Sequence, residues 1–287
     1  MRRFSLSTMV VGCALLLSAC APAYQAGGFT PNKSTLSTPE VTVETVEPTV
    51  DSPETPSTPE PPTPEPKERL AHGNEATGGP NCDVEKCIAL TFDDGPGDYT
   101  AQVLDALRAA NVPATFFVMG RQVKAQPELL RRAVAEGHAI GGHSWSHPQL
   151  TKLNNERLMH ELVDTNKEIE KVVGFTPNLM RPPYGAVNHR VRKVMADQGL
   201  AAILWDVDTL DWKDHNLDKA MGYVRQQTQN GSIILMHDVH EIAPQAVPLI
   251  VKEYSAKGFK FVTIPQLFAG KEMLPGAKHF NRFKVLK

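Results

Sequence analysis

From Cys87 onward, short apolar runs alternate with amphipathic stretches, and this alternation constrains the fold more than any other feature. The apolar runs predict strands at residues 88–92, 115–118, 139–141, 179–181, 201–205, 233–237 and 259–262. The stretches between them predict helices at residues 100–110, 127–136, 155–173, 188–198, 217–229 and 243–257. Strands that alternate with helices indicate an α/β fold with a parallel sheet. Periodicity alone does not decide between a closed barrel and an open, doubly wound sheet.

Polar residues follow several of these strands directly. Asp93 and Asp94 come after the first strand, and His143 and His147 come after the third. In a barrel, the loops at the carboxyl ends of the strands gather at one face, so these side chains are expected to form one site. Two histidines four residues apart, with a carboxylate, can bind one divalent metal. Each set alone also fits a turn, a helix cap or a surface histidine pair.

Five such sets occur in order: Thr91–Gly95, His143–His147, Arg181–Tyr184, Asp208–Trp212 and Leu235–His237. Together they resemble the five motifs of the NodB-homology polysaccharide deacetylases, carbohydrate esterase family 4. The resemblance covers roughly residues 87–265, and no catalytic position departs from the motifs. It implies the family's fold, a distorted (β/α) barrel of about seven parallel strands. That implication favours the barrel over the open sheet.

The resemblance also implies a metal centre and a base. Asp94, His143 and His147 would hold one divalent metal ion, with open positions for water and substrate. Zinc is the expected metal, while cobalt and nickel also suit this set of ligands. Asp93 would act as the general base on the attacking water, and Arg181 would pair with Asp93 and orient it.

The remaining motif residues are implied to complete the reaction. His237 would protonate the leaving amine, and the nearby Asp211 would raise the pKa of His237. The backbone N–H of Tyr184, held by the turn at Pro183, would stabilise the oxyanion. Trp212 and Leu235 would form the walls of a small pocket for the acetyl methyl group.

The N-terminus predicts export. Arg2 and Arg3 precede an apolar run over residues 9–17, which is typical of a signal peptide over residues 1–19. The residues before Cys20 resemble the lipobox of bacterial lipoproteins, which implies diacylation of Cys20 and a membrane anchor facing the cell wall. An ordinary signal peptide with a chance cysteine is the alternative.

Composition divides the rest of the chain. Pro, Thr, Ser and Glu dominate residues 20–80, which predicts a disordered linker before a deacetylase domain at 81–270 and a basic tail at 271–287. That tail either packs on the barrel or contacts anionic wall polymer. Cys82 and Cys87 are predicted to form a disulfide in an oxidising compartment. Free thiols and a metal pair are the alternatives.

The predicted function is removal of N-acetyl groups from an amino sugar polymer, with cell-wall peptidoglycan as the expected substrate. Chitin fragments, an exopolysaccharide or acetylated xylan are alternatives, and so is a non-catalytic carbohydrate-binding lipoprotein. A formal net charge of -2 offers no basic field for nucleic acid, so no such partner is expected. The sequence leaves the oligomeric state open.

Overall fold

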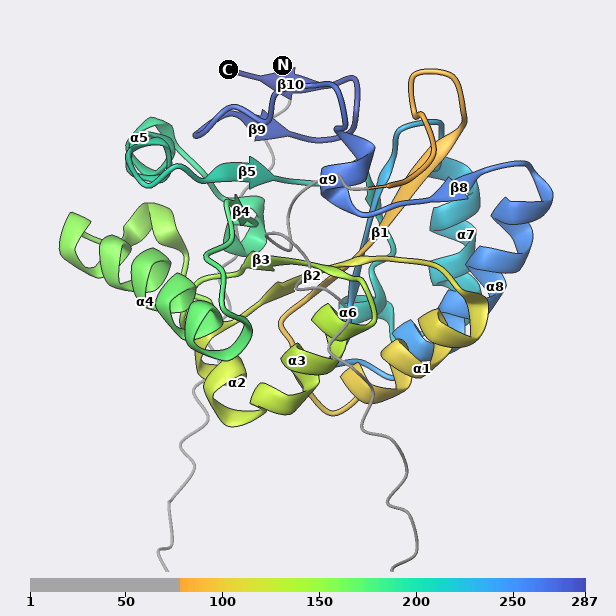
Figure 1. The fold of residues 1–287 in the computed structure, drawn as a ribbon, viewed down its shortest axis with the longest axis horizontal. Helices are drawn as coiled ribbons and strands as arrows, with labels where there is room; N and C mark the ends of the chain where they lie inside the picture. The colour runs from red at the N-terminus through yellow and green to blue at the C-terminus, as the bar shows by residue number, and fades with distance from the viewer. Residues whose placement is uncertain (1–77) are drawn as a thin grey trace, which may run out of the picture. The chain divides into compact units, whose positions relative to one another are not determined.

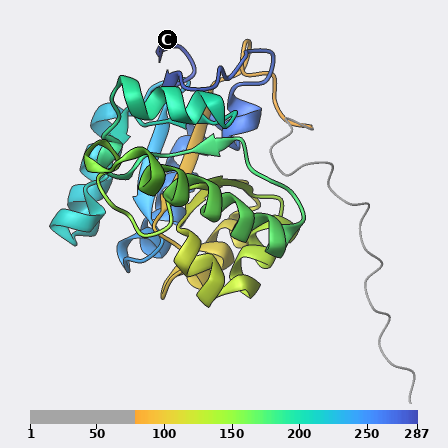
Figure 2. The ribbon, with the colours of Figure 1, turned by 90° about the vertical axis from the view of Figure 1, so that its left-hand side faces the viewer.

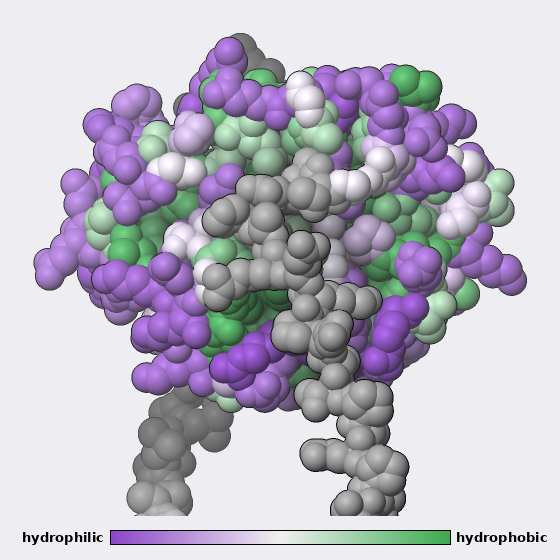
Figure 3. Space-filling view, viewed as in Figure 1, coloured by the Kyte–Doolittle hydropathy of each residue, from purple (hydrophilic) through white to green (hydrophobic). Residues whose placement is uncertain are grey.

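The computed structural model describes residues 78–287. The predicted signal peptide, Cys20 and the linker up to residue 77 lie outside this range. No helix within residues 78–287 combines the length and apolar character needed to cross a membrane. The face shown in Figure 3 carries mainly hydrophilic residues, with apolar residues in smaller areas between them.

A curled, mostly parallel sheet of ten strands forms the centre of this part of the chain (Figure 1). The strands are β1 (Cys87–Asp93), β2 (Thr115–Val118), β3 (Ala139–Gly142), β4 (Leu179–Met180), β5 (Ala201–Ile203), β6 (Val207–Asp208), β7 (Ile233–His237), β8 (Lys260–Phe261), β9 (Lys278–His279) and β10 (Val285–Leu286). Their order is β10-β9-β5-β4-β3-β2-β1-β7-β6, and β8 pairs with the start of β1. β10 runs antiparallel to β9, while the other ladders are parallel. The predicted distorted barrel is confirmed.

Helices connect and cover these strands. They are α1 (Thr100–Ala110), α2 (Gly120–Ala125), α3 (Pro127–Ala135), α4 (Asn155–Val173), α5 (His189–Asp197), α6 (Asp211–Asp214), α7 (Leu217–Gln227), α8 (Ile242–Ala256) and α9 (Ile264–Leu267), with 3₁₀ turns η1 (Leu150–Lys152) and η2 (Pro183–Gly185). The longest, α4, begins at the cap Asn154, whose side chain accepts a bond from the N–H of Arg157, and ends at left-handed Gly174. Figure 2 shows α4 and α5 in front of the sheet, where Leu162 and Met195 share an apolar cluster.

Every strand and helix predicted from periodicity is present within two residues of its expected ends. β2, β7, α1 and α4 have the predicted bounds. The elements that were not predicted are short: β6, β9, β10, α2, α6 and α9 span two to six residues each. Such segments are too short to complete a period, so only their tertiary contacts define them.

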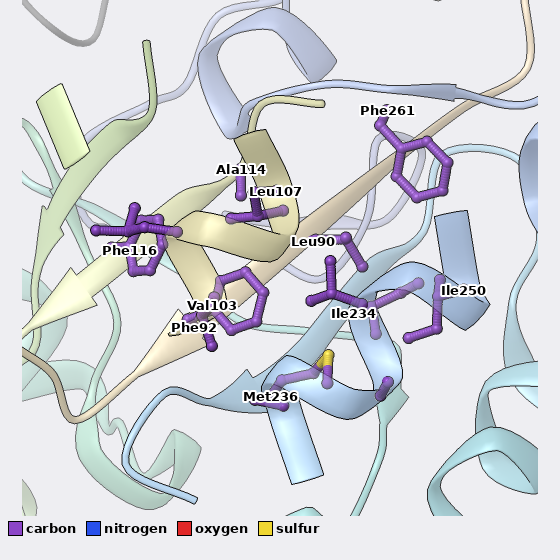
Figure 4. Packing of buried hydrophobic residues seen from close by; sticks show 14 of the residues in the cluster. Leu90, Phe92, Val103, Leu107, Ala114, Phe116, Ile234, Met236, Ile250 and Phe261 are labelled. Carbon is purple, nitrogen blue, oxygen red and sulfur yellow. The ribbon is translucent and has the colours of Figure 1, made fainter. Parts of the chain in front are cut away.

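Strand alternation decides which side chains reach the interior of the barrel. On β1, Leu90 and Phe92 face the helices and pack with Ile234 and Met236 of β7 (Figure 4). Residues of the opposite parity, which include Asp93 and His237, point to the other face of the sheet. There they are paired in register, because β1 and β7 are parallel neighbours.

A second apolar cluster fills the inner face near the amino end of β1. It combines Ala89, Phe117 and Ile233 from the sheet with Leu267 and Phe268 from α9 and its end. The disulfide between Cys82 and Cys87 joins this cluster, so the predicted bond is confirmed.

The C-terminal segment also packs on the sheet, which is one of the two roles that the sequence left open for residues 271–287. β9 pairs with β5, and Asn281 donates a hydrogen bond to Asp206 beyond that strand at 2.9 Å. The buried Arg282 pairs with Asp83 at 2.6 Å. The sheet therefore extends past Gly270, the predicted end of the domain.

Candidate active site

Asp93, at the carboxyl end of β1, is held by a buried arginine. Its Oδ1 accepts a hydrogen bond from Arg181 Nη1 at 2.8 Å, and both side chains are buried. The same guanidinium donates to the hydroxyl of Thr91 at 2.8 Å and to the carbonyls of Ile203 and Leu204 at 3.1 Å each. With its bonds directed to four acceptors, the guanidinium is a rigid support for Asp93.

Burial raises the pKa of Asp93, while the positive charge of Arg181 lowers it; the net direction is upward. A raised pKa makes the ionised carboxylate a better proton acceptor. The ion pair keeps an ionised form accessible within the buried site.

His143, at the end of β3, presents one ring nitrogen to the site. Its Nδ1 lies 2.7 Å from the carbonyl oxygen of Arg181. A carbonyl can only accept, so Nδ1 carries the hydrogen and Nε2 keeps its lone pair. That Nε2 lies 3.4 Å from Asp94 Oδ1 and 3.7 Å from Asp93 Oδ2.

The ligand atoms of Asp94, His143 and His147 converge on one point. They lie within 4.8 Å of one another, and His147 Nε2 is 3.6 Å from Asp94 Oδ1. Asp94 Oδ1 is buried and has no hydrogen-bond partner among residues 78–287. A buried carboxylate oxygen that lacks a donor, facing two imidazoles, is the arrangement that a divalent cation satisfies. The three residues therefore fit a metal ion.

A histidine–aspartate pair lies at the end of β7. His237 Nδ1 lies 2.9 Å from Asp211 Oδ1, and the His237 backbone N–H donates to the other oxygen of Asp211 at 2.8 Å. Burial lowers the pKa of His237, but the hydrogen bond and the charge of Asp211 outweigh it and raise that pKa to about 9. Burial raises the pKa of Asp211, but the hydrogen bonds and the charge of His237 together lower it further, so the net direction is downward. This imidazole is therefore a cation at neutral pH.

One pocket of about 390 Å³ brings these groups together. Its lining residues are Asp93, Asp94, His143, His147, Tyr184, Trp205, Asp208, Trp212, Leu235 and His237. Arg181 and Asp211 stand behind the lining, while Pro183 is buried in η2 and does not line the pocket. The exposed ring of Tyr184 packs edge-on against His147, with centroids 4.6 Å apart.

Comparisons with known proteins identify the family of the chain. The family model described as polysaccharide deacetylase matches residues 81–203. A peptidoglycan-N-acetylglucosamine deacetylase of Bacillus cereus is 37% identical over 193 residues, which cover 65% of this chain and 90% of that protein. The chain belongs to the polysaccharide deacetylase family.

Two further similarities show how far the family relationship extends. The peptidoglycan-N-acetylglucosamine deacetylase PgdA of Listeria monocytogenes is 41% identical over 204 residues, which are 71% of this chain and 43% of that protein. The chain thus spans less than half the length of that relative. The solved structure of T48 deacetylase with substrate has a TM-score of 0.68 and 44% identity, covering 70% of this chain and all of that one.

Two residues that line the pocket were not given a role in the site from the sequence. Trp205 lines the pocket and lies against Arg181, with the guanidinium carbon 5.5 Å from the ring centroid. Asp208 lines it as well, although the motif analysis gave roles only to Asp211 and Trp212. Trp205 is the last residue of the fifth predicted strand and Asp208 opens the motif that follows it, so their place at this strand end was the available signal.

Proposed function

We propose that the protein is a metal-dependent hydrolase that removes N-acetyl groups from cell-wall peptidoglycan and releases acetate. The observation that carries this proposal is the pocket shared by the Asp94–His143–His147 set, the buried carboxylate of Asp93 and His237, whose pKa is raised. A divalent cation, with zinc as the expected ion, would supply Lewis acidity there by polarising the acetyl carbonyl and acidifying the attacking water.

Asp93 takes the proton of that water. Its Oδ1 is held by Arg181, while Oδ2 remains directed to the side of His143. A fixed carboxylate with a raised pKa combines orientation with basicity. Arg181 acts as an orienting residue, and its own bonds to two backbone carbonyls keep it from turning away.

His237 gives a proton to the leaving nitrogen. Its pKa of about 9 leaves the ring charged at neutral pH. Asp211 occupies Nδ1, so the proton on Nε2 is the one available to the pocket. Collapse of the tetrahedral carbon then produces acetate and a free amine on the sugar.

The turn at Tyr184 supplies the remaining contacts. Tyr184 has a φ of 61°, and a left-handed residue here turns the backbone sharply after Pro183. We assign its N–H to the oxyanion and assign Trp212 and Leu235 to the acetyl methyl group. Both of these apolar side chains line the pocket.

Acetate release from defined polymers tests the proposal. The full-length protein with zinc is offered peptidoglycan, N-acetylglucosamine oligomers and acetylated xylan, and released acetate and new free amines are measured. Peptidoglycan is expected to be the best substrate, with equal amounts of acetate and amine. Faster release from the oligomers or from xylan would assign a different polymer. No release from any of them would contradict the enzymatic function itself.

The variant that tests the role of Asp93 in this assay is Asp93→Asn. It preserves the size of the side chain but removes the base, and a rate loss of about 10²–10⁴-fold is expected with zinc still bound. An unchanged rate would remove Asp93 as the base.

We also propose that the protein is exported and anchored through a diacylated Cys20. The support is the N-terminal sequence alone, because these residues lie outside the described range. Labelling of cells with a fatty-acid probe is expected to mark the wild type and to leave Cys20→Ala unmarked. Equal labelling of both would contradict the anchor.

A further inference from the structure

Glu161 is an acidic side chain on the apolar face of α4. It lies between Leu158 and Leu162, which are buried in the cluster shared with α5, and only 3% of Glu161 is exposed. Within residues 78–287, no cation forms an ion pair with it. A buried carboxylate is tolerated only when strong donors satisfy its oxygens.

Those donors come from the loop that joins the two histidine ligands. Glu161 Oε2 accepts the backbone N–H groups of Trp145 and Ser146 at 2.8 Å each. Its Oε1 accepts the hydroxyl of Ser146 at 2.7 Å. The carboxylate thus binds two of the three residues between His143 and His147 with three hydrogen bonds.

The backbone of this loop contains two residues in a disfavoured conformation. Ser144 and His147 have φ values of 64° and 62°, in the left-handed region that side chains other than glycine disfavour. A local bond from the His147 N–H to Ser144 Oγ at 3.0 Å closes part of the turn. The remaining constraint must come from outside the loop.

α2 holds the opposite edge of the loop. The N–H groups of Gly120 and Arg121 donate to the carbonyls of Ser144 and Trp145 at 3.1 and 3.2 Å. A Cβ at Gly120 would lie 2.3 Å from the indole of Trp145, so glycine permits this close approach. α2 therefore binds the carbonyls of the loop, while Glu161 binds its amides.

We infer that Glu161 is a positioning residue for the metal site, which holds the loop so that His147 Nε2 meets Asp94 Oδ1. The inference rests on the metal site of the proposed function. Without the three bonds, the loop loses the partners of two amides and relaxes from its left-handed residues. His147 then moves away from His143, and the site loses affinity for the cation. Outer groups that orient metal ligands have this effect in general.

Zinc affinity of the full-length protein, measured by competition with a chromophoric chelator, tests this role. Glu161→Ala is expected to raise the zinc Kd by about 10–100-fold. Glu161→Gln is expected to stay within about threefold of the wild type, because the amide oxygen accepts both N–H groups and the amide nitrogen donates to Ser146 Oγ. Glu161→Asp, which is one methylene shorter, is expected to bind zinc more weakly while retaining the charge.

Leu162→Ala is the matched control, because Leu162 is equally buried on the same helix and has no bond to the loop. It is expected to lower the melting temperature and to leave the zinc Kd unchanged. A wild-type Kd in Glu161→Ala would overturn the inference. So would a loss in Leu162→Ala as large as that in Glu161→Ala, or a loss in Glu161→Gln equal to that in Glu161→Ala.

Asp94→Ala separates this inference from the metal site itself. If the wild type and Asp94→Ala bind zinc equally, the metal site is wrong. If Asp94→Ala binds zinc weakly while Glu161→Ala binds it as tightly as the wild type, the metal site stands and the positioning role alone is wrong.

Discussion

His143 and His237 lie at the ends of β3 and β7, on either side of β1, and line the same pocket. Both rings are largely buried, and both use Nδ1 to bind an oxygen. For His143 that oxygen is the carbonyl of Arg181, and burial lowers the pKa of the ring to about 3. For His237 it is a carboxylate oxygen of Asp211, and the pKa rises to about 9.

The difference shows that burial alone does not set the charge of an imidazole. A neutral acceptor fixes the tautomer and leaves desolvation to favour the neutral ring, which suits a metal ligand. A carboxylate acceptor raises the pKa of the imidazole by more than burial lowers it. The ring then stays protonated, as a general acid requires. Two rings of the same residue type thereby acquire opposite preferences for the proton.

The largest effect is expected when the proposed metal site, which includes His143, loses a ligand. Asp94→Ala should lower the deacetylation rate by more than about 10³-fold, because polarisation by a cation supplies several kcal/mol of barrier reduction. Acetate release and zinc content are measured together. The pKa of His237, followed by NMR in zinc-free protein, should remain above its usual range, since its main partner Asp211 is intact. Zinc content equal to that of the wild type would contradict the role of Asp94.

The next largest effect is expected when the acceptor of His237, at the end of β7, is made neutral like the acceptor of His143, at the end of β3. Asp211→Asn replaces the carboxylate by a neutral acceptor, so burial should lower the pKa of His237 below its usual range. The rate at neutral pH should fall by about 10²-fold or more, while the zinc Kd stays unchanged. A pKa that remained near the value of the wild type would show that another group keeps His237 charged.

The same pair makes stability depend on pH in zinc-free protein. The folded pKa of His237 is about 9, above an unfolded value of about 6.5. Its contribution is complete below pH ~6.5 and is lost as the pH rises through ~9, a loss of about 3 kcal/mol in the free energy of unfolding. Urea unfolding between these two pH values measures this loss. Asp211→Asn should remove the dependence; if it persists there, groups other than this pair are responsible.

The smallest effect is expected at His240, whose ring lies edge-on to His237 with centroids 5.9 Å apart. It does not line the pocket. His240→Ala should therefore change the rate by less than about threefold. The measurement is the rate of acetate release across pH. A tenfold loss would show that the neighbouring ring, as well as Asp211, sets the charge of His237.

Much of the fold could be predicted from the sequence because periodicity extends over whole elements. α1 and α4 show complete helical patterns, and their bounds agree with the structure. The short strands β6 and β9 could not be predicted, since each consists of two residues whose neighbours are remote in sequence. Glu161 had one signal, an acidic residue within the apolar stripe of α4. The loop that satisfies it lies 15 or more residues away in the sequence.

The sequence by itself determined which chemical groups follow which strands, because a parallel sheet brings the carboxyl ends of its strands to one edge. From this rule, the sequence predicts one site that contains Asp93, Asp94, His143, His147 and His237. Only the tertiary structure decided how each imidazole is charged. The oxygen that binds His143 comes from 38 residues away and the one that binds His237 from 26 residues away. Local sequence carries no signal for such a contact, since it depends on how remote strands fall into register.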